Sequence, residues 1–160
     1  MRRNRMPAIS FVHIALLCLA CNAVAQDTRM IGAPVPTLDY ARLYVDAEGV
    51  SHFDDGTLML SVQNYAPPAN PIAIHAFENL DSATFVFLPQ GAAEDWHPAP
   101  RRQFAIITQG TVEVTAGDGE ARRFGPGDIV LLEDTTGTGH QTRVIGDQGN
   151  LSIMVAAGNG

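Results

Sequence analysis

Two histidines and one glutamine have the spacing of side chains that can meet at one end of a β-hairpin. His97 lies near the end of one predicted strand, and Gln103 begins the next, so both can face the same end of the fold. His140 follows a later apolar segment, and we expect it to enter the same region. Two imidazoles and an amide oxygen can bind a divalent ion on one face and leave positions open for water and substrate. We therefore predict that His97, Gln103 and His140 are metal ligands.

The segments that would position these residues are typical of short β-strands. Alternation along the segment that starts at Gln103 would turn Gln103, Ala105 and Ile107 inward and the residues between them outward. Glycine-rich clusters at 116–119 and 125–128 predict turns, and no helical period of useful length follows residue 50. The predicted strands are residues 83–88, 103–108, 111–115, 129–132 and 151–155. Many short strands joined by turns predict an all-β sandwich or barrel.

The block around His97 resembles the first signature of the cupin superfamily, G-x5-H-x-H-x3-E-x6-G. Every interval matches from Gly91 through His97 to Gly110. Two identities differ, because Ala99 stands at the second histidine position and Gln103 at the glutamate position. The block therefore resembles a cupin metal motif in which two ligands are replaced.

A second block resembles the other cupin signature, G-x5-P-x-G-x2-H-x3-N, with a longer loop. It runs from Gly127 to His140, with Glu133 at the proline position, Thr135 at the glycine position and the histidine two residues late. The sequences of both blocks are similar to those of single-domain bacterial cupins. The resemblance implies an all-β fold, the antiparallel double-stranded β-helix or jelly-roll barrel, over residues 51–157. It also implies a pocket inside one mouth of the barrel.

The two replacements change the expected metal chemistry in one direction. A neutral amide at Gln103 does not offset the charge of a cation, and Ala99 provides no nitrogen ligand, so metal affinity should fall. The ion would be a single divalent metal, with iron, manganese, zinc, nickel and copper not distinguished. No nucleotide-binding motif is present, so no nucleotide cofactor is expected. Four other residues are candidates for the missing ligands, although each also fits a structural role: His52, His75, Glu133 and Asp134.

Three residues beside His97 are predicted to contact substrate. Arg101 and Arg102 lie in the connection to the next strand, where a guanidinium can bind a carboxylate or an enolate. Trp96 is the single tryptophan and can form a wall of the pocket. The alternatives are a tryptophan that packs at the barrel rim and surface arginines paired with Glu94, Asp95 or Glu133.

Two functions are consistent with these residues. The first is a metal-dependent enzyme acting on a small oxygenated organic substrate by lyase, isomerase or dioxygenase chemistry, with the ion as a Lewis acid. The glycines of the 135–139 loop favour it, because they would let backbone amides approach a ligand. The second is a non-catalytic barrel that binds a small molecule or a protein partner without metal, and Ala99 favours this alternative.

The first 25 residues predict export. Three arginines precede an apolar stretch, and residues 23–25 have the small-x-small pattern of a signal-peptidase site. The stretch of about a dozen residues is shorter than the roughly 20 that span a membrane as a helix. Cleavage would yield a periplasmic or secreted protein without cysteine, while lipidation at Cys21 is the alternative. Residues 26–50 are predicted to be an N-terminal extension, in which 37–45 form helical turns or an arm on a sheet.

The charge of the exported part restricts its partners. The chain has no lysine, and after residue 25 seven arginines stand against 17 acidic residues. Such a surface repels phosphate backbones and anionic lipids, so we expect a small-molecule ligand and neither nucleic acid nor stable membrane insertion. Cupins often dimerise and sheet edges need covering, so a homodimer is the candidate assembly.

Overall fold

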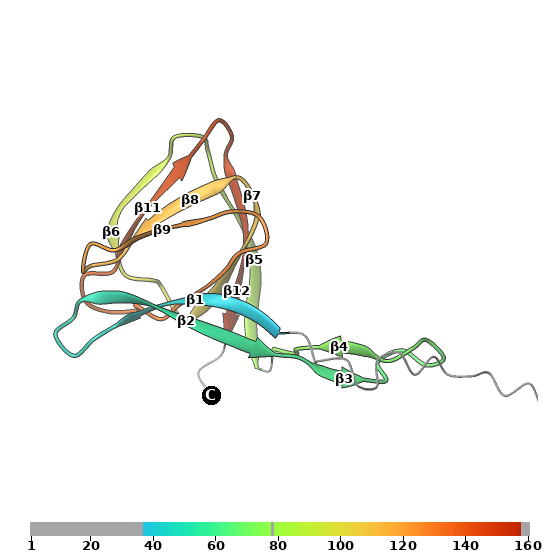
Figure 1. The fold of residues 1–160 in the computed structure, drawn as a ribbon. Coiled ribbons are helices and arrows are strands. Elements are labelled where there is room, and N and C mark those ends of the chain that lie inside the picture. The colour runs from blue at the N-terminus through green and yellow to red at the C-terminus, as the bar shows by residue number, and fades with distance from the viewer. Residues whose placement is uncertain (1–36, 78, 158–160) are drawn as a thin grey trace, which may run out of the picture.

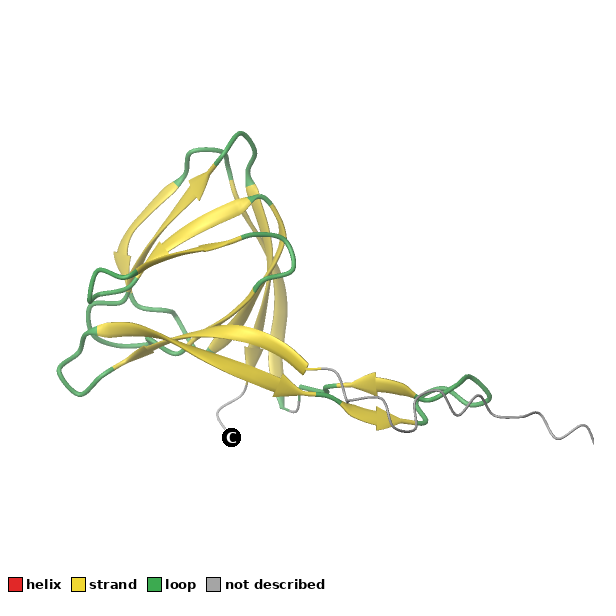
Figure 2. Ribbon diagram, in the orientation of Figure 1, coloured by secondary structure: helices red, strands yellow, loops and turns green. Residues whose placement is uncertain are grey.

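The computed structural model describes residues 37–77 and 79–157, and throughout these ranges the regular structure consists of strands. The predicted signal peptide and the first part of the predicted extension lie outside the described residues. Two sheets face each other, and a small hairpin projects from one side of them (Figures 1 and 2). In the described part of the chain, no helix is long and apolar enough to cross a membrane. The all-β prediction is confirmed.

The larger sheet has six strands in the order β2-β1-β10-β7-β12-β5. Its neighbours are antiparallel, except that β1 and β10 run parallel. The strands are β1 (Thr37–Val45), β2 (Ser51–Met59), β5 (Leu80–Leu88), β7 (Gln103–Gln109), β10 (Ile129–Leu132) and β12 (Asn150–Ala157).

The smaller sheet has four strands in the order β6-β11-β8-β9, and a separate pair forms the projecting hairpin. The four strands are β6 (Ala93–His97), β8 (Thr111–Thr115), β9 (Ala121–Phe124) and β11 (His140–Ile145). The hairpin strands are β3 (Ser61–Gln63) and β4 (Ile72–Ile74). This arrangement of facing antiparallel sheets is that of a jelly-roll barrel.

The inner faces of the two sheets enclose the main core. Leu43 is completely buried there, and Ala105, Val112 and Val130 belong to the same apolar cluster. Register pairs Val130 with Ala105 and Leu132 with Gln103, so alternate residues of β10 and β7 point inward together. The predicted inward set on β7 is thereby confirmed. Because one face of each strand is buried, a register slip by a single residue would expose this core.

Strand β1 differs from the prediction for the N-terminal part of the chain. The sequence predicts that residues 37–45 form either helical turns or an arm on a sheet, outside a barrel that begins at residue 51. In the structure it is a strand of the larger sheet, paired with β2 and β10. The reason is that only Ala41 and Leu43 are fully buried along it, while polar residues occupy the alternate positions. Two buried apolar residues are too few to show the alternation that identifies a strand in the sequence.

The turn between β1 and β2 holds the loop that leads to His140. The completely buried Ser51 donates its hydroxyl hydrogen to the carbonyl oxygen of Gly139 (2.6 Å) and accepts a hydrogen bond from the Gly117 amide (2.6 Å). The Thr138 amide donates to the carbonyl oxygen of Gly49 (2.9 Å). The N-terminal hairpin therefore positions a loop almost ninety residues later in the chain.

His52 adds an ionic contact to the same junction. Its Nε2 lies 2.8 Å from Asp46 Oδ2 and its Nδ1 lies 2.8 Å from Asp118 Oδ2. Hydrogen bonds to Asp46 and then Asp118 raise the pKa of His52, and the pKa of Asp46 is lowered in return. A protonated ring can donate to both carboxylates at once, so the charged form is the one this junction stabilises.

We expect His52→Gln to change how stability depends on pH. A raised folded pKa means that the stabilisation is fully present below the unfolded value of about 6.5 and is lost as pH rises through the folded value. The wild type should therefore exceed the variant in thermal midpoint by more at about pH 5.5 than at about pH 9. Thermal unfolding at the two pH values measures the difference, and an equal difference at both would contradict the assignment.

Candidate functional site

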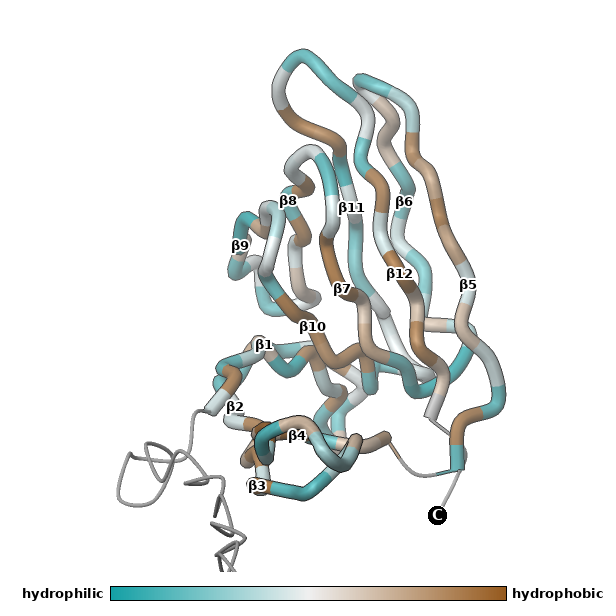
Figure 3. Tube along the Cα trace, turned by 90° about the vertical axis from the view of Figure 1, so that its right-hand side faces the viewer, coloured by the Kyte–Doolittle hydropathy of each residue, from teal (hydrophilic) through white to brown (hydrophobic). Residues whose placement is uncertain are grey.

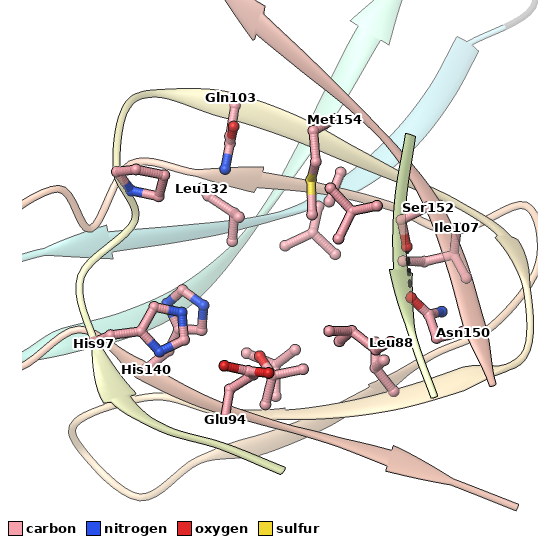
Figure 4. Close-up of a pocket in the computed structure, with 17 residues that line it drawn as sticks. Leu88, Glu94, His97, Gln103, Ile107, Leu132, His140, Asn150, Ser152 and Met154 are labelled. Carbon is pink, nitrogen blue, oxygen red and sulfur yellow. Dashed lines mark hydrogen bonds between the residues drawn. The ribbon is translucent and has the colours of Figure 1, made fainter. Parts of the chain in front are cut away.

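A cavity of about 290 Å³ lies between the two sheets and is the candidate site. Aliphatic side chains from both sheets form most of its wall, and a few polar groups converge on it (Figure 4). The volume is near the lower end of the range for small-molecule pockets. The polar lining residues are Glu94, His97, Gln103, His140, Thr142, Asn150 and Ser152.

His97 and His140 lie side by side on the wall formed by the smaller sheet. They are directly paired between β6 and β11, and their ring centroids are 4.7 Å apart. His97 Nδ1 lies 2.6 Å from the carbonyl oxygen of Asp95, and His140 Nδ1 lies 2.7 Å from Asp134 Oδ2. Both acceptors require a hydrogen on Nδ1, so in the neutral form of each ring Nε2 carries the free lone pair. Two such nitrogens can bind a metal ion or accept a proton from a ligand.

Asp134 orients His140 from inside the protein. Its side chain is completely buried, and its Oδ2 accepts the hydrogen bond from His140 Nδ1. Its Oδ1 has no hydrogen-bond partner. Burying a carboxylate with one oxygen unsatisfied is unfavourable unless positive charge lies nearby. The sequence placed Asp134 in an exposed loop or among the missing ligands, whereas the structure makes it the partner of a histidine.

Ala99, at the position of the second cupin histidine, is part of the hydrophobic core. It is almost completely buried in the main apolar cluster, and its amide donates to the carbonyl oxygen of Asp134 (3.0 Å). This contact ties the connection after His97 to the loop that precedes His140. Position 99 therefore offers no ligand to the cavity, and its backbone helps to hold the loop before His140.

Gln103 reaches the cavity from the opposite sheet. The hairpin predicted between His97 and Gln103 is wrong, because β6 pairs with β11 while β7 pairs with β10 and β12. Pro98 and Pro100 in the connection have no amide hydrogen, so the chain cannot continue a ladder there and crosses between the sheets. Gln103 nonetheless lines the same cavity as the two imidazoles (Figure 4). The cavity thus has nitrogen donors on one wall and an amide on the other.

Glu94 is the acidic residue of the cavity, and the sequence did not predict it there, nor did it predict Thr142, Asn150 and Ser152. Register pairs His140 with His97 and Thr142 with Glu94, so two residues of β6 oppose one residue of β11. An extra residue in one strand is a β-bulge, and it reverses the alternation of side chains. Glu94 and His97 therefore both line the cavity although they are three positions apart (Figure 4). A pairing irregularity of this kind leaves no composition signal.

The predicted substrate contacts lie outside this cavity. Arg102 donates from Nε to Glu133 Oε1 (2.6 Å), and Arg42 donates to the other oxygen of the same carboxylate. Burial would raise the pKa of Glu133, but the hydrogen bonds from Arg42 and Arg102 outweigh it and keep that pKa below its ordinary value. The surface pairing proposed as the alternative is confirmed for Arg102. Arg101 lines the same surface hollow, which shares Pro100 with the cavity.

Trp96 and the remaining candidate ligands are also placed elsewhere. Trp96 is 43% exposed and does not line the cavity. His75 contacts the carbonyl oxygen of Met59, His52 is engaged by its two aspartates, and Glu133 pairs with arginines. Across residues 37–77 and 79–157, no group of three or more histidine, cysteine, aspartate or glutamate side chains is arranged to hold a metal. Only two strong donors, His97 and His140, adjoin each other in the cavity.

The glycines of the 135–139 loop approach protein backbone. A Cβ atom on Gly139 would overlap the carbonyl group of His97, and one on Gly137 would overlap that of Gly49. Both residues have positive φ, which glycine adopts without strain. The sequence predicts that amides of this loop approach a ligand, whereas in the structure its two glycines pack against protein backbone. The contact of Gly139 with His97 holds the loop before His140 close to the end of β6.

Residues 83–156 match the family model described as Cupin domain. Among solved structures, the chain is similar to a Cupin 2 conserved barrel domain protein from Salinispora arenicola, at 22% identity and a TM-score of 0.41, covering 60% of this chain and 73% of that chain. It is also similar to KdgF from Halomonas sp., at 24% identity and a TM-score of 0.39, covering 70% and 82%. NovW, a 4-keto-6-deoxy sugar epimerase of Streptomyces spheroides, has 16% identity and a TM-score of 0.38, covering 80% and 74%. No curated protein matches this chain in sequence.

We expect Gly139→Ala to destabilise the protein more than the matched change Gly91→Ala. Both glycines have nearly the same φ, +71° and +72°, but only Gly139 has backbone atoms where the new methyl group would lie. The positive φ alone costs about 1–2 kcal/mol, and the overlap with His97 should add about 1–3 kcal/mol. Urea unfolding of both variants measures the two effects. Equal losses would show that the loop does not depend on this contact.

Proposed function

Because the chain belongs to the cupin superfamily, we propose that its cavity binds a small oxygenated organic substrate beside one divalent metal ion held by His97 and His140. The observation that carries the proposal is the state of the two imidazoles. Each has its Nδ1 bonded to an oxygen acceptor, which leaves Nε2 as the free donor at the cavity. We further propose that the protein acts on this substrate as a periplasmic or secreted enzyme.

The donor set fits a divalent ion, although weakly. Histidines that bind metals usually donate their other ring hydrogen to a carboxylate or a backbone carbonyl, and these two do so to Asp134 and to the Asp95 carbonyl. The positive charge of an ion bound to His140 would also help to compensate the buried carboxylate of Asp134, whose Oδ1 has no hydrogen-bond partner. With two imidazoles as the strong protein donors, the affinity should be lower than that of a site with three or four.

The other polar residues of the cavity would position and polarise the substrate. A bound ion would supply Lewis-acid chemistry toward a carbonyl or hydroxyl oxygen. The Gln103 amide can donate to a substrate oxygen or accept from a hydroxyl, from the wall opposite the histidines. Glu94 can accept a proton from a bound substrate, and its carboxylate is the acidic group that the cavity lining contains. Lyase, isomerase and dioxygenase chemistry are each compatible with this set.

A second function, binding of a small molecule without metal or catalysis, is favoured by one observation. Ala99 is packed into the core where a third imidazole would have stood. Such a barrel would use the aliphatic walls of the cavity for affinity and the polar groups for orientation. The two functions differ in their metal content, so a metal measurement separates them.

We expect the purified protein to bind a divalent metal in a way that depends on both histidines. His97→Ala and His140→Ala should each abolish binding of zinc or manganese in calorimetric titrations, while circular dichroism shows that the barrel remains folded. Asp134→Asn should weaken binding by about 10–100-fold, as expected when the partner of a ligating histidine is changed. The control is His75→Ala, which lies outside the cavity and should bind like the wild type.

If the wild type takes up no metal, or if neither histidine variant alters uptake, the metal proposal fails and the metal-free barrel is favoured.

We expect Gln103→Glu to tighten metal binding. The substitution restores the negative charge that the cupin signature carries at this position and preserves the size of the side chain. The same titrations measure the change, with tighter binding as the expected result. Unchanged or weaker affinity would show that the side chain at position 103 does not reach the ion.

A further inference from the structure

The cavity contains a second polar group, formed by Asn150 and Ser152 of β12. Both residues are 2% exposed, and both line the cavity. Figure 4 shows them across the cavity from His97 and His140, and we call their position the far end. Neither residue belongs to the proposed metal site. Buried polar groups are stable only when they are hydrogen-bonded, so the partners of this pair identify what the far end can still bind.

An apolar stretch separates the far end from the polar residues near the histidines. Register pairs Ser152 of β12 with Ile107 of β7, and Gln103 begins β7 four residues earlier. At about 3.3 Å per residue, roughly 13 Å of strand lies between these two levels. Ala105 and Met154 pair between them and line the cavity. Figure 3 shows apolar segments along β5, β7, β10 and β12. The cavity therefore has polar groups at each end and an apolar middle.

The hydrogen bonds of the pair determine which atoms it offers to a ligand. Asn150 Nδ2 donates to the carbonyl oxygen of Gln109 (3.0 Å), which can only accept. The amide nitrogen points away from the histidines (Figure 4), and Oδ1 accepts the hydroxyl hydrogen of Ser152 (2.7 Å). That hydroxyl hydrogen is therefore already used. The lone pairs of Ser152 Oγ and Asn150 Oδ1 remain, and both are hydrogen-bond acceptors.

The charge of the cavity favours the same kind of ligand group. Glu94 is its acidic residue, and none of the described residues that line it is an arginine. The chain has no lysine, and its formal net charge is −7. A carboxylate or a phosphate at the far end would meet lone pairs without a compensating positive charge. A hydroxyl or an N–H group would instead donate to the two acceptors.

We propose that Asn150 and Ser152 bind a hydroxyl or N–H group of the substrate at the far end. The substrate class is then a small molecule with an oxygen at the ion, an apolar middle and a hydrogen-bond donor at its other end. This assignment deepens the proposed function and rests on it for the metal end alone. The cavity volume of about 290 Å³ suits such a molecule, because a cavity of about 150 Å³ holds a benzene ring.

The test is the binding of phenol, anisole and benzoate to the purified protein in EDTA, followed by ¹H–¹⁵N NMR. The three probes share a ring and present a donor, an acceptor and an anion. Phenol should bind about fivefold more tightly than anisole, the effect of one hydrogen bond, and benzoate should bind more weakly than either. Nuclear Overhauser effects from the phenol ring should reach the side-chain amide hydrogens of Asn150.

The double variant Asn150→Val/Ser152→Ala removes both acceptors and should bind phenol no more tightly than anisole. The matched control is Thr108→Ala, on the neighbouring strand. It removes a hydroxyl that donates to the carbonyl oxygen of Leu151 (2.8 Å) outside the cavity, so the preference for phenol should be unchanged. Circular dichroism checks that both variants are folded.

Two results would overturn the proposal. One is a wild type that binds phenol no better than anisole, and the other is a double variant that keeps the preference for phenol. If the double variant does not fold, the wild-type spectra decide, because phenol contacts to His97 and His140 without contacts to Asn150 would exclude the far end. The probes are measured without metal, so a protein that prefers phenol but takes up no metal would refute only the metal site.

Discussion

The buried hydrogen bond between Asp134 and His140 is the interaction on which the candidate site depends. A carboxylate without access to water is placed there at a cost, and the surrounding structure keeps it in position through backbone contacts. The Ala99 amide, the Ser51 hydroxyl and the carbonyl of Gly49 each bond the chain between Asp134 and Gly139. The direction of one imidazole is therefore determined by segments from the beginning, middle and end of the barrel.

The two faces of the larger sheet have different surroundings, because the pleat of each strand directs alternate side chains to opposite sides. Inward residues of β7, β10 and β12 line the cavity, while outward residues form a second apolar surface. A substitution on one face therefore need not disturb the packing on the other. Phe77 packs against Phe104 on the outward side of the larger sheet, and the histidine wall belongs entirely to the smaller sheet.

The sequence was sufficient for the fold and for part of the site. Strongly apolar strands such as 103–108 and 129–132 were predictable because both of their faces are buried, and the spacing of His97 and His140 marked the cavity wall. Strands such as β6 and β9 were not, because they are mostly polar and are held in place by pairing with neighbours far away in sequence. The inward turn of Glu94 and the burial of Asp134 depend on register and long-range packing, which residue types alone do not encode.

The β-bulge in β6 also has an evolutionary consequence. It places one extra residue between Glu94 and His97, and the pairing of Thr142 with Glu94 and of His140 with His97 keeps both side chains at the cavity. In a regular strand, residues three positions apart face opposite sides of the sheet, so a shift of pairing that removed the bulge without loss of a residue would turn either Glu94 or His97 away from the cavity. Loss of one residue between them would instead leave both side chains inward in a regular strand, so the carboxylate and the imidazole can share this cavity at either of two spacings in a related sequence.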